Sequence, residues 1–264
     1  MIYPFEVRTV TTDAYEMEYI VFGEGKTPFV MIPGVSMSSV IFSAEFIAAA
    51  YARFGASHTV YVFDRKKHIT PGYSVEDMAA DTADAMRRLG LANADVFGTS
   101  QGGMIAQRIA ENAPELVGRL LLASTLARPN EVSRAVFERW CELSAAGDIR
   151  ALNHDVFYHV YSDEYLARHR RAFSSLEKIG TAEEAARFAV LCEACRRFDG
   201  WDGLEAIRCP VLVIGSEKDR TVSALGSREI AEKLGCEVYL YGGYGHAVYD
   251  EAPDYKDRIA AFFD

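Results

Sequence analysis

The sequence has no long apolar run and no excess of basic residues. A membrane-spanning helix needs about 18 consecutive apolar residues, and no such span occurs. The formal charge of -10 and the pI near 5.2 argue against surfaces for nucleic acid or for anionic membranes. The segment Met1 to Glu6 lacks a basic stretch followed by an apolar one. We therefore expect a cytoplasmic protein, monomer or homodimer, that binds neither nucleic acid nor membrane.

Cysteine is scarce and irregularly spaced. The odd total of five, at Cys141, Cys192, Cys195, Cys209 and Cys236, does not make a disulfide framework. Cys192 and Cys195 have the spacing of a redox or zinc motif, but no second pair stands at ligand spacing, and their neighbours are typical of a partly buried helix. We expect free core thiols and no metal site.

The apolar residues make up half of the sequence and are enough for a large core. Continuous apolar runs, typical of strands covered on both faces, alternate with segments of helical periodicity. This alternation predicts right-handed crossovers and an α/β fold with a mostly parallel, doubly wound sheet. Two antiparallel edge strands are expected around residues 5–7 and 15–21. Further strands are expected at 28–32, 59–64, 95–99, 119–124, 209–215 and 237–241, and helices at 38–51, 74–89, 224–234 and 252–263.

The strand pattern stops between Ala127 and Trp201. Segments rich in Arg, Glu, Ala and aromatic residues replace it, and they read as helices. The sequence therefore predicts a helical insertion, 127–201, after the sixth strand, with the core formed by residues 1–126 and 202–264.

The stretch from Asp95 to Met104 predicts a buried strand, an abrupt turn with Ser100 at its apex, and the start of a helix. Gly98 and Gly102 flank Ser100 as G-x-S-x-G because so sharp a turn leaves no room for Cβ atoms. The turn presents the hydroxyl as a nucleophile, and the N–H of Gln101 lies at the positive end of the helix, where it can bind an oxyanion. By chance the motif would occur in about one such chain in ten, so the interpretation depends on this setting.

A serine nucleophile needs a base, and His246 is the best-placed histidine. It lies in a glycine-rich loop directly after the last predicted strand. His154 and His159 are five residues apart and would diverge on a helix. The remaining histidines sit in polar segments that read as surface: His58, His68 and His169.

The acid that orients the base is assigned to Asp219. It follows the apolar run that ends at Ile214, and it gives the order Ser, Asp, His along the chain. Glu217 is the competitor because it lies closer to the strand end. The segment after Ser124 offers no carboxylate until Glu131, which makes an acid there a poor alternative.

A second oxyanion donor is expected from the loop after the strand at 28–32. This loop reads Pro33-Gly34-Val35-Ser36, and we assign the donor to the backbone N–H of Val35.

Together these segments resemble the α/β-hydrolase fold family, in its capped esterase, lactonase and haloperoxidase-like group. The resemblance covers almost the whole chain and rests on Gly98 to Gly103, on Gly215 to Val222, and on Gly245-His246, in the family's order. It implies an α/β-hydrolase core with a helical cap, or lid, formed by the insertion. No metal and no organic cofactor is implied.

The sequence also departs from relatives. Pro33-Gly34 stands where many members have His-Gly, and the loop from Arg65 to His68 lacks their glycine-rich run. Ser100 in place of Asp argues against haloalkane-dehalogenase-like activity, and Gln101 is not the Trp usual in proline-iminopeptidase relatives.

The expected function is that of a serine hydrolase acting on a small carboxylic ester, thioester or lactone through an acyl-enzyme. Two alternatives stay open: a triad-bearing small-molecule receptor or signalling protein, and non-hydrolytic use of the triad in acyl transfer, C–C bond cleavage or perhydrolysis. Aromatic residues of the insertion could line an apolar cleft, although packing on the core is the plainer expectation for each: Phe137, Trp140, Phe157, Tyr158, Tyr161, Tyr165 and Phe173.

Overall fold

The computed structural model describes residues 3–263. Three residues lie outside this range: Met1 and Ile2, at the start of the segment Met1 to Glu6, and Asp264, at the end of the predicted core. The described chain forms one sheet with the strand order β1-β2-β4-β3-β5-β6-β7-β8. Its strands are β1 (Glu6–Thr11), β2 (Glu16–Phe22), β3 (Thr27–Ile32), β4 (His58–Phe63), β5 (Ala94–Thr99), β6 (Val117–Ala123), β7 (Val211–Ser216) and β8 (Glu237–Tyr241).

The sheet is parallel from β4 to β8 and antiparallel where β1 and β2 join it. This confirms the predicted mostly parallel α/β fold. Of the two amino-terminal strands only β1 is an edge, because β2 also pairs with β4. Parallel strands end at one edge of the sheet, so the loops that carry Gly34, Ser100, Asp219 and His246 are brought together there.

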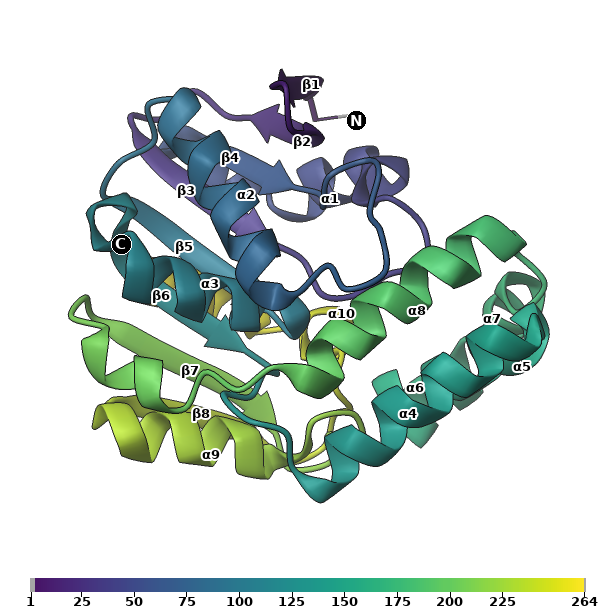
Figure 1. The fold of residues 1–264 in the computed structure, drawn as a ribbon. Helices are drawn as coiled ribbons and strands as arrows, with labels where there is room; N and C mark the ends of the chain where they lie inside the picture. The colour runs from purple at the N-terminus through teal and green to yellow at the C-terminus, as the bar shows by residue number, and fades with distance from the viewer. Residues whose placement is uncertain (1–2, 264) are drawn as a thin grey trace.

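Helices cover both faces of the sheet (Figure 1). One face packs against α2 (Val75–Arg88), α3 (Gln101–Asn112) and α9 (Ser223–Leu234), and the other against α1 (Ala44–Ala50), α10 (Val248–Glu251) and α11 (Tyr255–Phe263). Strand β3 shows the two-sided burial: Val30 and Ile32 belong to the first core, and Phe29 and Met31 to the second. The helix expected at 38–51 begins instead as a 3₁₀ turn, Val40–Ser43, so α1 is short.

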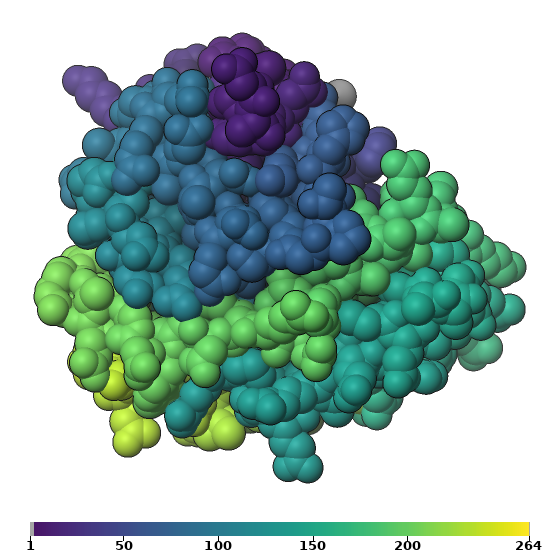
Figure 2. All heavy atoms as spheres, viewed as in Figure 1, coloured from purple at the N-terminus to yellow at the C-terminus, as the bar shows by residue number. Residues whose placement is uncertain are grey.

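The chain between β6 and β7 is helical, as the sequence predicted for the insertion. It forms α4 (Glu131–Ala146), α5 (Ile149–Val160), α6 (Asp163–Arg168), α7 (Arg170–Leu176) and α8 (Ala182–Arg197). These inserted helices lie beside the carboxyl edge of the sheet (Figure 1), and in the space-filling view the green α8 region lies against the blue part of the core, with the teal helices outside it (Figure 2). The exact domain boundaries at 127 and 201 stay a prediction.

Within residues 3–263, each helix is too short or too polar to cross a membrane.

Candidate active site

Ser100 lies at the tight turn between β5 and α3. Its backbone adopts φ 53° and ψ -121°, a conformation that side-chain-bearing residues rarely take, and it is 4% exposed. A Cβ on Gly102 would lie 1.8 Å from the carbonyl oxygen of Ile32, and one on Gly98 would lie 2.5 Å from the carbonyl oxygen of Gly102. Close backbone approach therefore requires both glycines. For Gly98 the crowding lies within the turn, as the sequence predicted, whereas for Gly102 it comes from the end of β3.

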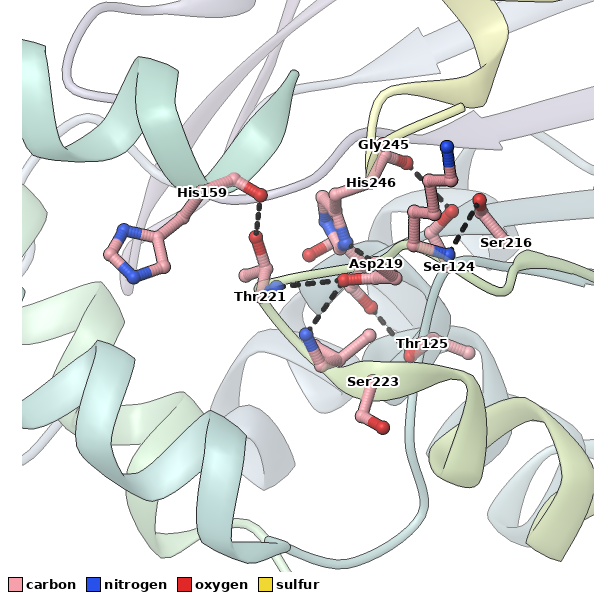
Figure 3. Close-up of polar contacts among 12 residues, drawn as sticks. Ser124, Thr125, His159, Ser216, Asp219, Thr221, Ser223, Gly245 and His246 are labelled. Carbon is pink, nitrogen blue, oxygen red and sulfur yellow. Dashed lines mark hydrogen bonds and ion pairs between the residues drawn. The ribbon is translucent and has the colours of Figure 1, made fainter. Parts of the chain in front are cut away.

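Asp219 and His246 form a buried pair. Nδ1 of His246 donates to Oδ2 of Asp219 at 2.8 Å (Figure 3). The other carboxylate oxygen accepts the N–H groups of Thr221 at 2.8 Å and Val222 at 2.9 Å. Burial by itself would raise the pKa of Asp219, but the charge and hydrogen bond of His246, together with these two N–H groups, hold that pKa below its usual range.

The loop that carries His246 is held by side chains that the sequence analysis did not select. Ser124, directly after β6, donates from Oγ to the carbonyl oxygen of His246 at 2.8 Å (Figure 3). Ser216, at the end of β7, donates from Oγ to the carbonyl oxygen of Tyr241 at 3.1 Å. The position of these two serines at the ends of buried strands is the sequence feature that could have identified them. A Cβ on Gly245 would lie 2.8 Å from backbone atoms of Val160, Tyr161 and Ser162, so this glycine is required by packing.

The competing residues lie elsewhere. Glu217 is exposed and pairs with Arg228. His154 is exposed. The surface assignment is confirmed for His68 and His169, but it is wrong for His58. His58 is 3% exposed and bridges Ser57 Oγ, at 2.8 Å, and Asp95 Oδ2, at 3.0 Å, at the amino ends of β4 and β5.

The loop after β3 lies against the Ser100 turn. A Cβ on Gly34 would approach Cβ of Ser100 to 3.1 Å, and Val35 lines the same cavity as Ser100 and His246. The carbonyl oxygen of Ser100 accepts the hydroxyl of Thr125 at 2.7 Å. Both segments chosen as oxyanion donors, at Val35 and Gln101, thus adjoin the serine.

A cavity of about 430 Å³ opens at Ser100 and His246. No Asp, Glu, Lys or Arg contributes to its wall among the described residues, and the inserted helices supply most of its apolar lining. Of the aromatic residues proposed for a cleft, Trp140, Phe157 and Tyr161 line this cavity. The others do not: Phe137 packs in the core, Phe173 packs on Phe157, Tyr158 is 48% exposed, and Tyr165 lines the neighbouring cavity.

That neighbouring cavity has a volume of about 450 Å³. The two cavities share six lining residues: Gly34, Ser36, Ser38, Ser43, Thr99 and Tyr249. The wall of the neighbouring cavity contains the exposed apolar residues Phe42 and Phe46 and a set of charged side chains: Asp64, Arg65, Arg187, Asp250 and Lys256. The loop at Gly34 therefore contributes to the walls of both cavities.

The cysteines are free, and Cys192 and Cys195 are buried in α8. Burial raises the pKa of Cys195 to about 12 and raises that of Cys192 as well, so both are neutral thiols. Residues 3–263 contain no cluster of His, Cys, Asp and Glu arranged to hold a metal ion.

Comparisons with known proteins agree with this fold. Residues 29–256 match the model of the alpha/beta hydrolase family. The chain is 28% identical over 192 residues to "Putative carbamate hydrolase RutD" of Rhizobium rhizogenes (71% of this chain, 73% of the relative) and 30% identical over 188 residues to the protein of that name from Caulobacter segnis (69% and 70%).

Among solved structures, MGS-M2, an alpha/beta hydrolase enzyme from a deep-sea metagenome library, matches with a TM-score of 0.86 and 21% identity over 97% of both chains. The enol-lactonase from Burkholderia xenovorans matches with a TM-score of 0.84 and 19% identity over 97% of this chain and 99% of its own. At such identities the structural matches establish a shared fold. The chain belongs to the alpha/beta hydrolase family.

Proposed function

We propose that the protein is a serine hydrolase that cleaves a small carboxylic ester, thioester or lactone through an acyl-enzyme intermediate. The observation that carries this proposal is the shared cavity: Ser100, strained at a helix amino terminus, and His246, held by Asp219, both line it. A nucleophile, a base and an orienting acid at one cavity are the components that acyl transfer requires.

In the proposed reaction, Ser100 Oγ attacks the carbonyl carbon while Nε2 of His246 takes its proton. Asp219 fixes the imidazole with Nδ1 protonated and stabilises its positive charge. The N–H groups of Gln101 and Val35 bind the oxyanion of the tetrahedral intermediate. His246 then protonates the leaving group, and in the second half it activates water, which releases the acid and restores Ser100.

The cavities support a particular kind of substrate. The wall of the cavity at Ser100 contains no Asp, Glu, Lys or Arg among the described residues and is largely apolar where the inserted helices form it, so it suits an uncharged acyl group or ring. The second cavity, with Arg187 and Lys256 beside Asp64 and Asp250, suits a leaving group that carries polar or charged atoms. We infer an ester-like substrate with an apolar acyl part.

The relatives' printed name adds a carbamate to the substrates to be tested, since a carbamate could follow the same route through a carbamoylated Ser100. The receptor alternative predicts tight ligand binding with very slow turnover. The non-hydrolytic alternatives predict that added nucleophiles compete with water, or that a peracid forms from acetate and peroxide.

The test combines turnover and active-site labelling. Hydrolysis of p-nitrophenyl esters of increasing acyl length and of a p-nitrophenyl carbamate would be measured on unlabelled protein. Fluorophosphonate labelling would be measured on separate samples, and Ser100→Ala and His246→Ala are the controls in both assays. We expect both turnover and labelling to vanish in Ser100→Ala. An unlabelled wild-type protein, or labelling that persists in Ser100→Ala, would refute the proposed nucleophile.

A further inference from the structure

Arg65 joins the two segments that carry the proposed oxyanion donors. It follows β4 and is 4% exposed. Its Nη2 donates to the carbonyl oxygen of Pro33 at 2.7 Å. Nε and Nη2 both donate to Oε1 of Gln101, at 3.2 and 3.1 Å. One planar guanidinium therefore fixes the loop that leads to Val35 relative to the residue after Ser100.

The side chain of Gln101 extends this link to the inserted helices. Gln101 is fully buried, and its Nε2 donates to the carbonyl oxygen of Leu191 at 2.8 Å and to Sγ of Cys195 at 3.2 Å. Both residues belong to α8. Both polar atoms of the Gln101 side chain thus have partners: Oε1 accepts from Arg65, after β4, and Nε2 donates to α8.

A second arginine makes a parallel contact from α8. Arg187 approaches Asp64 Oδ1 at 3.3 Å and the carbonyl oxygen of Ser36 at 3.4 Å. The same oxygen of Asp64 accepts the backbone N–H of Arg65 at 2.7 Å. The carbonyl groups of Pro33 and Ser36, on either side of Val35, are therefore both held by arginines. In Figure 2 the blue segment that follows β4 lies directly against green α8.

The energetics indicate that this arrangement serves more than packing. The Arg65 side chain donates to neutral oxygens, although a buried cation is costly unless it is well compensated. An apolar residue of similar length would leave the Pro33 carbonyl and Gln101 Oε1 without their donors. Arginine is suited to such a site because its rigid fork can hold two acceptors at once.

We propose that Arg65 and Gln101 form a clamp that positions the oxyanion hole and couples it to α8, with Arg65 as a positioning residue. The inference rests on the proposed acyl-enzyme function. It also accounts for the two departures from relatives, because the guanidinium of Arg65 anchors the Pro33-Gly34 loop. The clamp acts on the transition state, where the oxyanion exists, so its loss should lower kcat far more than it changes KM.

The test uses Arg65→Met, Arg65→Lys and Arg65→Ala, with Arg108→Met as a matched control. Arg108 is also a largely buried arginine, but it pairs with Glu76 and Glu111, away from both cavities. The measurements are kcat and KM on the best ester, the rate of fluorophosphonate labelling of Ser100, the affinity for a trifluoromethyl ketone that forms an oxyanion adduct with serine, and the Tm.

We expect Arg65→Met to lower kcat and the labelling rate on the order of 10²-fold and to weaken ketone binding by a similar factor, with little change in KM. Arg65→Lys should stay impaired, because one ammonium cannot replace the fork. Methylguanidinium should restore part of the activity of Arg65→Ala through the cavity that Arg65 lines. Arg108→Met should lower the Tm and leave the other quantities unchanged.

If Arg65→Lys were labelled at the wild-type rate and bound the ketone with wild-type affinity, the clamp would be overturned. This test remains available if Arg65→Met does not fold, because Arg65→Lys keeps the buried positive charge. If the Arg65 variants lost only Tm, as expected for Arg108→Met, and kept wild-type kcat, labelling rate and ketone affinity, Arg65 would have a purely structural role and the proposal would be refuted. Failure of the proposed function would show differently, as absence of labelling in the wild-type protein.

Discussion

The imidazole of His246 and the carboxylate of Asp219 meet at 2.8 Å, with the two residues only 4% and 8% exposed. The second oxygen of Asp219 is occupied by the N–H groups of Thr221 and Val222. Neither the carboxylate nor the ring is then free to turn, since the carbonyl of His246 is also held by Ser124. Within the proposed mechanism, this fixes which imidazole nitrogen faces the cavity.

Asp219→Asn should therefore reduce kcat on the order of 10⁴-fold, because an amide can stabilise the wrong tautomer of His246 and cannot balance its charge. Steady-state kinetics on the best p-nitrophenyl ester would measure this. Glu217→Gln, a change at the exposed competitor, is the control and should retain activity. Equal losses in both variants would contradict the assignment of the acid.

The depressed pKa of Asp219 also predicts a pH dependence of stability. An unfolded aspartate titrates near pH 3.9, and the folded carboxyl titrates lower, so its ionised form stabilises the fold above about pH 4. This contribution is lost as the pH falls through the folded pKa. Urea titrations between about pH 5 and pH 3 would give the free energy of unfolding of the wild-type protein and of Asp219→Asn. The wild-type value minus the variant's value should become smaller as the pH falls. A difference that grows toward acid would contradict the lowered pKa of Asp219.

Gly102→Ala should destabilise the protein by about 3 kcal/mol and abolish activity, because the new Cβ would lie 1.8 Å from the carbonyl oxygen of Ile32. Gly242→Ala is the matched control, since a Cβ there meets nothing within 4 Å. It should change stability by less than about 0.5 kcal/mol. Urea unfolding of both variants gives the comparison, and a Gly102→Ala protein as stable as Gly242→Ala would show that the turn can relax.

Val156→Phe should shift the preferred acyl chain to shorter lengths, because Val156, on α5, lines the cavity at Ser100. We expect kcat/KM to fall at least about 10-fold for the longest accepted ester and to change little for the acetate. The control is Val132→Phe on α4, at a position 40% exposed and outside both cavities. A uniform loss over all chain lengths would mean that this cavity does not bind the acyl group.

The thiols of Cys192 and Cys195 should be inert in the folded protein. Both are buried, and the pKa of Cys195 is raised to about 12, so almost no thiolate exists at pH 8. Ellman's reagent at pH 8, followed by peptide mapping, should modify neither residue until urea is added, after which all five cysteines react. The half-buried Cys209 serves as the internal comparison. Rapid modification of Cys195 in native protein would contradict the neutral, buried assignment.

The sequence by itself determined the features that depend on short stretches of chain. Apolar runs alternating with helical periodicity gave the parallel sheet, because strand and helix periods are local properties. The spacing of Gly98 and Gly102 around Ser100 predicted the tight turn, because a strand that reverses into a helix within a few residues crowds its own backbone, as at Gly98. The crowding of Gly102 by Ile32 of β3 comes from a distant segment. Ser100, Asp219 and His246 each follow a predicted strand, and parallel strands end at one edge of a sheet, so their loops were expected there. In the structure Asp219 contacts His246.

Only the tertiary structure decided the features that depend on contacts between distant segments. His58 sits in a polar stretch yet is buried, because Asp95 on the neighbouring strand pairs with it. Arg65 was noted as a departure, and its contacts with Pro33 and Gln101 become visible only once three loops converge. The cavity wall likewise comes from α4, α5 and α8, whose side chains face the serine through packing that no local pattern encodes.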